Sequence, residues 1–150
     1  MTDTLDLESF FPFLLSRLSN RVSNAIAATY SDEHALSVRQ WRVLCLVGNY
    51  PGTTARAVAE KGALDKVAVS RSVAHLVDRG LVEREVDEQD RRQVHLKLSR
   101  TGLAITRAIV PRALAVEAQM LAALSEEERR VLTDCMDRLF DRTGDLREAE

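Results

Sequence analysis

The sequence predicts a mostly α-helical protein with one small antiparallel β-hairpin. Apolar residues recur every three to four positions along most of the chain, which is the period of amphipathic helices. Aromatic residues make up only 5% of the chain, and abundant alanine, leucine and arginine favour helices packed through aliphatic side chains. Only residues 81–86 and 94–99 alternate between apolar and polar side chains, which is the period of half-buried strands.

The first predicted helix covers residues 13–30, which contain neither glycine nor proline. Pro12 suits the first turn of this helix, where the missing N–H costs little. A loop containing His34 follows. Ser37 and Gln40 then have the spacing of a capping box, which predicts a second helix that ends at Gly48, before a Pro-Gly turn.

Two shorter helices come next. The segment TARAVAEKG predicts a helix that stops at Gly62. Asp65 is predicted to be the N-cap of the helix KVAVSRSVAHLVD, and Gly80 is predicted to end this helix.

The hairpin consists of LVEREV and VHLKLS, joined by the charged segment DEQDRRQ. After Ser99 the pattern is helical again. A long helix, RTGLAITRAIVPRALAVEAQMLAAL, precedes a capping box of Ser125 and Glu128 that opens the last helix. We therefore predict three regions, with residues 1–34 and 101–150 flanking a central domain at 35–100.

Composition excludes several classes of protein. The formal net charge is −2, so a basic surface for nucleic acid must be local. The two cysteines, Cys45 and Cys135, are far apart without metal-ligand spacing, and no nucleophile–base pair or glycine-rich phosphate loop marks an enzyme. No secretion signal or membrane-spanning run is evident, which favours a cytoplasmic protein without a membrane partner.

Two short helices followed by a hairpin predict a winged helix-turn-helix domain. In the second short helix, a stripe of Val69, Val73, Leu76 and Val77 is predicted to be buried. The opposite, polar face suits the major groove of DNA. The candidate DNA-binding residues in this region are Thr54, Lys66, Val67, Ala68, Ser70, Arg71 and His75.

The tip of the hairpin contributes the other candidates, Asp90, Arg91 and Arg92. A thin ribbon with adjacent arginines fits the minor groove, where the negative potential attracts cations. We expect Asp90 to orient a guanidinium through a charge-assisted hydrogen bond. The alternative is that this charged turn is merely solvated.

The segment from Thr54 to Gly102 closely resembles the MarR family of bacterial transcriptional regulators, most specifically in its wing sequence DRR and the strand that follows. The resemblance implies a homodimer, built from the N- and C-terminal helices, that binds a palindromic operator. It places Arg71 on the recognition helix and Arg92 at the minor groove. Val67 and Ala68 depart from the small hydroxyl residues usual in the family, so we expect an altered operator preference, with thymine methyls as partners.

Members of this family commonly bind small aromatic acids or phenols, so such an effector is also expected here. Arg17, Arg21, Trp41 and Arg42 combine an aromatic surface with cations that could hold a carboxylate. The alternative is that Trp41 belongs to the core and that the arginines pair with Asp or Glu across the dimer. Cys45, among aliphatic neighbours, is expected to be a buried hydrophobe, with a redox role for either cysteine left open.

The sequence thus favours a ligand-responsive repressor that binds palindromic double-stranded DNA as a homodimer and needs no cofactor or metal. The main rival is a winged-helix adaptor that binds protein and has lost DNA binding. Such an adaptor predicts a wing and a recognition helix without cations, whereas Lys66, Arg71, Arg91 and Arg92 are all present.

Overall fold

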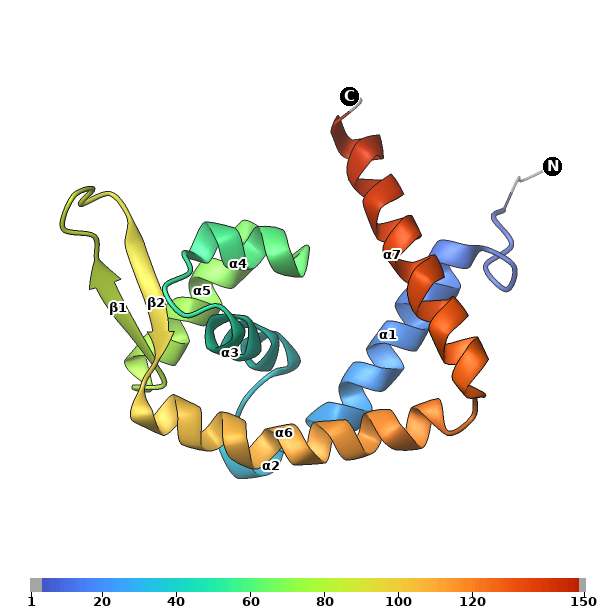
Figure 1. The fold of residues 1–150 in the computed structure, drawn as a ribbon, viewed down its shortest axis with the longest axis horizontal. Coiled ribbons are helices and arrows are strands. Elements are labelled where there is room, and N and C mark those ends of the chain that lie inside the picture. Colours follow the sequence, from blue (N-terminus) through green and yellow to red (C-terminus); the bar gives the residue numbers. More distant parts are fainter. Residues whose placement is uncertain (1–3, 149–150) are drawn as a thin grey trace. The chain divides into compact units, whose positions relative to one another are not determined.

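The fold is described by a computed structural model covering residues 4–148, in which helices predominate and the sheet has two antiparallel strands (Figure 1). This confirms the predicted class. The elements in order are α1 (Phe11–Ala27), α2 (Ser31–His34), α3 (Val38–Asn49), α4 (Ala55–Gly62), α5 (Lys66–Asp78), β1 (Val82–Val86), β2 (Val94–Leu98), α6 (Arg100–Leu121) and α7 (Glu126–Glu148).

Backbone contacts divide the chain into two compact units, Met1–Ala113 and Leu114–Glu150. The first unit holds the elements from α1 to β2 and the beginning of α6. The second holds the end of α6 and α7. Within the described part of the chain, no single helix is long and apolar enough to cross a bilayer, and α6 and α7 reach that length and composition only as a bent pair.

Local hydrogen bonds explain where the helices of the central region begin. The Ser37 hydroxyl accepts the N–H of Gln40 at 3.2 Å, and the Gln40 side chain accepts the N–H of Ser37 at 2.9 Å, so the predicted capping box is present. At the start of α5, the Asp65 carboxylate accepts the N–H of Ala68 at 2.8 Å. After α5, Gly80 adopts a φ of +67°, which turns the chain toward β1.

Two parts of the predicted element order are wrong. His34 lies in the short helix α2 and not in a loop, and Ala35 ends this helix in the left-handed region. Gly48 lies inside α3, which continues to Asn49. A Cβ at Gly48 would meet the Leu98 side chain at 3.0 Å, so this glycine serves the close approach of β2 and does not stop the helix.

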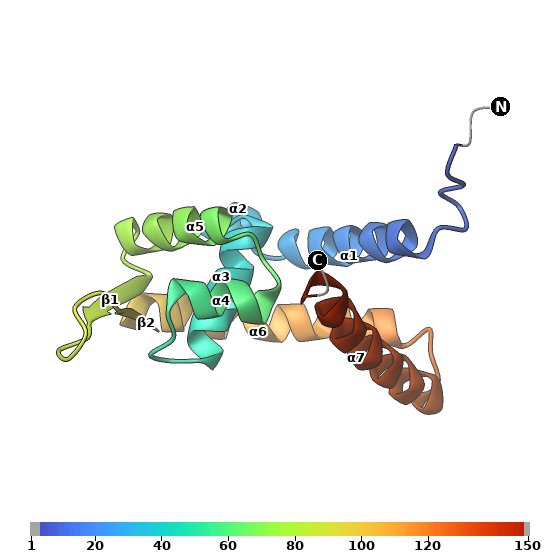
Figure 2. The ribbon, with the colours of Figure 1, turned by 90° about the horizontal axis from the view of Figure 1, so that it is seen from above.

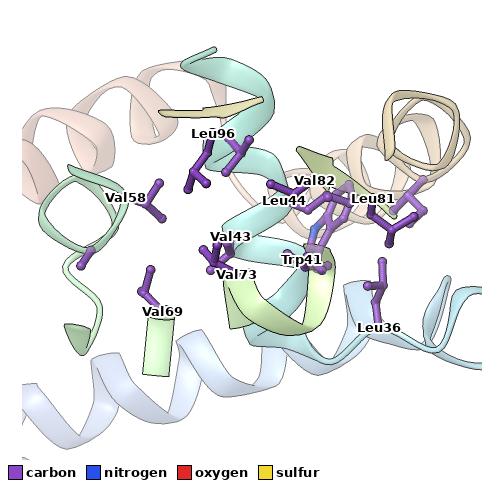
Figure 3. Close-up of a cluster of buried hydrophobic side chains, with 14 of the residues drawn as sticks. Leu36, Trp41, Val43, Leu44, Val58, Val69, Val73, Leu81, Val82 and Leu96 are labelled. Carbon is purple, nitrogen blue, oxygen red and sulfur yellow. The ribbon is translucent and has the colours of Figure 1, made fainter. Parts of the chain in front are cut away.

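The core of the first unit lies where α3, α4, α5 and the hairpin meet (Figure 3). Val43, Leu44 and Leu76 are fully buried there. Trp41 is also buried and its ring lies 5.3 Å from that of Tyr30, as the alternative interpretation of Trp41 expected. This packing fixes α5 against α3 and the base of the hairpin.

The hairpin is anchored along both edges of β2. On one edge β2 pairs with β1 in a register that places Val82 opposite Leu98 and Val86 opposite Val94. On the other edge, the N–H of Leu96 donates to the Thr53 carbonyl at 2.7 Å, and the N–H of Gly52 donates to the Leu96 carbonyl at 2.9 Å. The turn between α3 and α4 is therefore bonded directly to the wing.

Candidate nucleic-acid interface

Helix α5 has one buried and one exposed face, as its periodicity predicts. Val69, Val73 and Leu76 are buried, whereas Val77 is only half-buried. Ser72 is the other buried residue of this helix. Its hydroxyl donates to the Ala68 carbonyl at 2.9 Å, which satisfies the polar group within its own helix.

Figure 2 shows the course of helix α5 from above. Its other face exposes Lys66, Ser70, Arg71 and His75. Val67 is 58% exposed although it is apolar, and Ala68 beside it is half-buried. Among residues 4–148, no packing covers this exposed valine. An apolar side chain between polar ones is suited to contact a thymine methyl group.

A shallow recess of about 280 Å³ runs between α5 and the beginning of α3. Arg71 and His75 line it from α5, and Arg39 lines it from α3. Arg39 was not among the DNA-binding residues predicted from the sequence. Its position in the first turn of a capped helix was an available signal, because exposed N–H groups at such a turn attract anions.

Thr54 has a structural role in addition to its predicted one. Its side chain accepts the N–H of Ala57 at 3.2 Å and caps α4. The capped end of α4 lies directly after the turn that bonds to the wing.

The wing tip is organised by two aspartates. The Asp87 carboxylate accepts the N–H groups of Gln89 and Asp90, both at 2.8 Å. Asp90 accepts the backbone N–H of Arg92 at 3.1 Å and a side-chain N–H of Gln93 at 3.4 Å. The prediction that Asp90 orients a guanidinium is therefore wrong, because Asp90 shapes the backbone of the loop and does not touch the charged groups.

Arg91 and Arg92 are exposed at this tip. None of the ion pairs found between residues 4 and 148 uses the guanidinium groups of Arg71, Arg91 or Arg92. These cations thus differ from Arg56, which pairs with Glu60 at 2.8 Å, and from Arg130, which pairs with Glu127 at 2.6 Å. Free guanidinium groups on a thin ribbon are available to phosphates and to the minor groove.

His95, on β2, makes a contact through each of its two ring nitrogens. One ring nitrogen, Nδ1, lies 2.8 Å from the Gly52 carbonyl, and the other, Nε2, lies 3.0 Å from Asp87 Oδ2. Bonds from the Asp90 N–H, the His95 ring and the Gln89 N–H lower the pKa of Asp87 to about 2. The bond to Asp87 and the bond to Gly52 raise the pKa of His95.

The four candidate effector residues are not all brought together. Trp41 and Arg42 line a cavity of about 280 Å³ between α3 and the end of α4, together with Cys45, Leu46, Gly62 and Leu64. The Arg42 guanidinium donates to the Ser23 hydroxyl of α1 at 2.6 Å. Arg17 instead lies over the Phe13 ring at 5.7 Å and 3.8 Å from Glu8, and Arg21 is exposed on α1. Neither of these two arginines lines the cavity.

The two cysteines have different surroundings. Cys45 is half-buried beside the cavity, and burial raises the pKa of its thiol to about 12, so very little thiolate exists near neutral pH. Cys135 is exposed on α7. In the described part of the chain, no group of three or more histidine, cysteine or acidic side chains is placed to hold a metal ion.

The sequence model of the MarR family matches residues 35–93, which include α3 to α5 and most of the wing. The transcriptional regulator HosA of Escherichia coli O157:H7 is 27% identical over 106 residues, covering 71% of this chain and 78% of HosA.

Two solved structures are similar along almost their full length. The transcriptional regulator PcaV of Streptomyces coelicolor, solved in complex with its natural ligand, is 28% identical with a TM-score of 0.79, covering 93% of this chain and 98% of PcaV. FabT of Streptococcus pneumoniae, solved in complex with DNA, is 26% identical with a TM-score of 0.72, covering 94% of this chain and 99% of FabT.

Proposed function

Because this chain belongs to the MarR family of winged helix-turn-helix transcriptional regulators, we propose that it represses transcription as a cytoplasmic homodimer bound to a palindromic operator. DNA binding is the general activity of this family and catalysis is not. The observation that carries the proposal is the exposed set of cations Lys66, Arg71, Arg91 and Arg92, none of which takes part in an ion pair within the described residues. The rival hypothesis, a winged-helix adaptor that binds protein and not DNA, does not explain why these cations are present.

A second copy of the chain is the partner that best fits the terminal helices. Helix α7 has no buried residue among its described side chains and exposes Val131, Leu132, Met136, Leu139 and Phe140. Helix α1 exposes Phe11, Leu15 and Leu18. Apolar surface of this extent is typical of interfaces. We propose that residues 1–34 and 101–150 form the dimer contacts and that residues 35–100 bind DNA.

A dimer on a palindrome makes a geometric prediction. Two α5 helices must enter major grooves about 34 Å apart, one helical turn of DNA. Insertion of about five base pairs between the half-sites turns one of them to the opposite face, so we expect affinity to fall toward the non-specific level, by at least about 100-fold. Anisotropy with the gene's own upstream duplex measures this loss, and light scattering gives the number of chains bound.

Binding of a single chain, or binding indifferent to the insertion, would contradict the palindromic dimer. Binding at the non-specific level on all duplexes would favour the adaptor. Repression itself is tested with a reporter gene behind the same upstream region, whose expression is expected to rise when the regulator is deleted.

We further propose that the cavity beside Trp41 takes a small aromatic acid or phenol that weakens operator binding. The ring would lie against Trp41 and Leu46, and a carboxylate would bind Arg42. Replacing Arg42 with methionine removes a charge-assisted hydrogen bond, so affinity for benzoate should fall by about 10- to 100-fold. Affinity for uncharged phenol should change much less. Calorimetry with both probes measures the difference.

Arg17→Met and Arg21→Met are the matched controls, because each removes the same charge from α1 outside the cavity lining. Both are expected to leave benzoate affinity nearly unchanged. An equal loss in either variant would mean that the carboxylate binds on α1, and an unchanged Arg42→Met would contradict the assignment of this cavity.

A further inference from the structure

The contacts of His95 require an unusual protonation state. Both of its hydrogen-bond partners, the Gly52 carbonyl oxygen and the Asp87 carboxylate, can only accept. A neutral imidazole has one N–H and one lone pair, so it can satisfy only one of them. The two bonds at 2.8 Å and 3.0 Å exist together only when both ring nitrogens carry a proton.

The alternative for Asp87, protonation of its carboxyl, is excluded by its other contacts. Asp87 Oδ1 already accepts two backbone N–H groups, and its pKa is about 2. The carboxylate is therefore ionised at any physiological pH. The proton in the hydrogen bond between His95 and Asp87 must therefore belong to the His95 ring.

These contacts form a continuous link from the body of the domain to the wing tip. The link runs from the Gly52 carbonyl through the His95 ring to Asp87, and from Asp87 to the N–H groups that begin the loop carrying Arg91 and Arg92. The segment that contains Gly52 also pairs with β2 through Leu96. The position of the loop thus depends on a side chain outside the loop.

Resting on the proposed DNA-binding function, we propose that doubly protonated His95 is a positioning residue for the wing. It holds the loop with Arg91 and Arg92 in the conformation that enters the minor groove. Above the pKa that His95 has in the free protein, operator binding is then coupled to uptake of one proton from solvent by this ring.

The surroundings of the ring support this coupling. Its charged neighbours are Asp87 and, across the hairpin, Glu85, and both favour the imidazolium. Lys97, two residues along β2, is held 3.7 Å from Glu83 and 3.5 Å from Glu85. The turn packed against the ring, residues 50–53, contains no charged side chain.

The direction of the pH effect follows from the raised pKa of His95. The link from Gly52 through His95 to Asp87 is complete below the ordinary histidine pKa of about 6.5. It is lost as pH rises through the higher pKa that His95 has in the folded protein. Above that value a ring lone pair faces an acceptor oxygen. Affinity should then fall by up to about tenfold for each unit by which DNA binding raises the pKa of His95.

The first measurement is nitrogen NMR of the histidine rings in the free, full-length protein. We expect the pKa of His95 to exceed that of an ordinary histidine, with both ring nitrogens protonated below that pKa. Asp87→Asn should lower this pKa. Glu88→Gln is the matched control, because it removes the same charge from the next residue of the loop, and it should leave the raised pKa in place. A His95 pKa at or below that of an ordinary histidine would overturn the proposal.

The second measurement is operator anisotropy between pH 6 and pH 9 at fixed salt. The wild type and Glu88→Gln should lose affinity as pH rises. His95→Gln and Asp87→Asn should not show this loss of affinity with rising pH. His75→Gln identifies any contribution of the recognition helix α5 to the pH dependence. The same loss in His95→Gln as in the wild type would overturn the coupling while leaving DNA binding intact. Absence of operator binding by the wild type at every pH would instead refute the proposed function. The NMR result would still show whether His95 links Gly52 to Asp87.

Discussion

Alanine at both Arg91 and Arg92 is expected to weaken operator binding by at least about 1,000-fold near physiological salt. Each dimer would lose two wing-tip guanidinium groups per protomer, and contacts of this kind are each worth about 1–3 kcal/mol in discrimination. Neither guanidinium takes part in an ion pair within the described residues. Their removal therefore leaves no buried acid unpaired, and the fold should be unaffected.

The salt dependence of binding distinguishes loss of these contacts from loss of structure. The slope of log affinity against log salt should decrease by about one unit for each phosphate contact removed. If Arg92 reads a narrow minor groove, the largest loss should occur on duplexes with A·T-rich flanks. Anisotropy of labelled duplexes over a salt series measures both effects.

A matched control changes the net charge equally on a helix of the second unit. Arg130→Ala with Arg138→Ala removes two arginines of α7, each paired with an acid of its own helix. Surface pairs of this type contribute only a few tenths of a kcal/mol. Provided that light scattering shows it to remain a dimer, this variant should keep the wild-type salt slope. Equal losses in the two double variants would show that bulk charge, and not the wing, determines affinity.

Replacement of Gly102 by alanine is expected to cost about 3 kcal/mol of the free energy of unfolding, the upper end of the usual range for overpacking. Gly102 is buried in the first turn of α6, where an added Cβ would collide with the backbone carbonyl oxygen of Leu81. A backbone atom cannot move aside as a flexible side chain does. The same carbonyl accepts the N–H of Ser99 at 3.0 Å, so the collision also disturbs the link between the wing and α6.

Gly144→Ala provides the control for this prediction. Gly144 lies inside α7 with no atom within 4 Å of its added Cβ, so alanine there should add up to about 1 kcal/mol through helix propensity. Urea unfolding at a fixed protein concentration measures both variants. A Gly102→Ala protein as stable as the wild type would mean that the corner between Leu81 and α6 can relax.

The sequence by itself determined the features that depend on neighbouring residues. The capping boxes at Ser37 and Ser125 and the N-cap at Asp65 formed as predicted, because each needs only partners three residues away. The buried stripe of α5 and the two strands followed from their periods, which decide which side of an element can face a core. The family resemblance rested on the same local patterns.

Only the tertiary structure decided which distant residues meet. His95 and Gly52 are 43 positions apart, and no local pattern indicates that they are bonded. The roles of Gly48 and Gly102 likewise depend on Leu98 and Leu81, which approach them through packing of other elements. The cavity is lined by Trp41 and Arg42 but not by Arg21, because it forms where α3 packs against the end of α4. Such contacts are set by the path of the whole chain, because burial and long-range hydrogen bonds exist only once the elements have packed together.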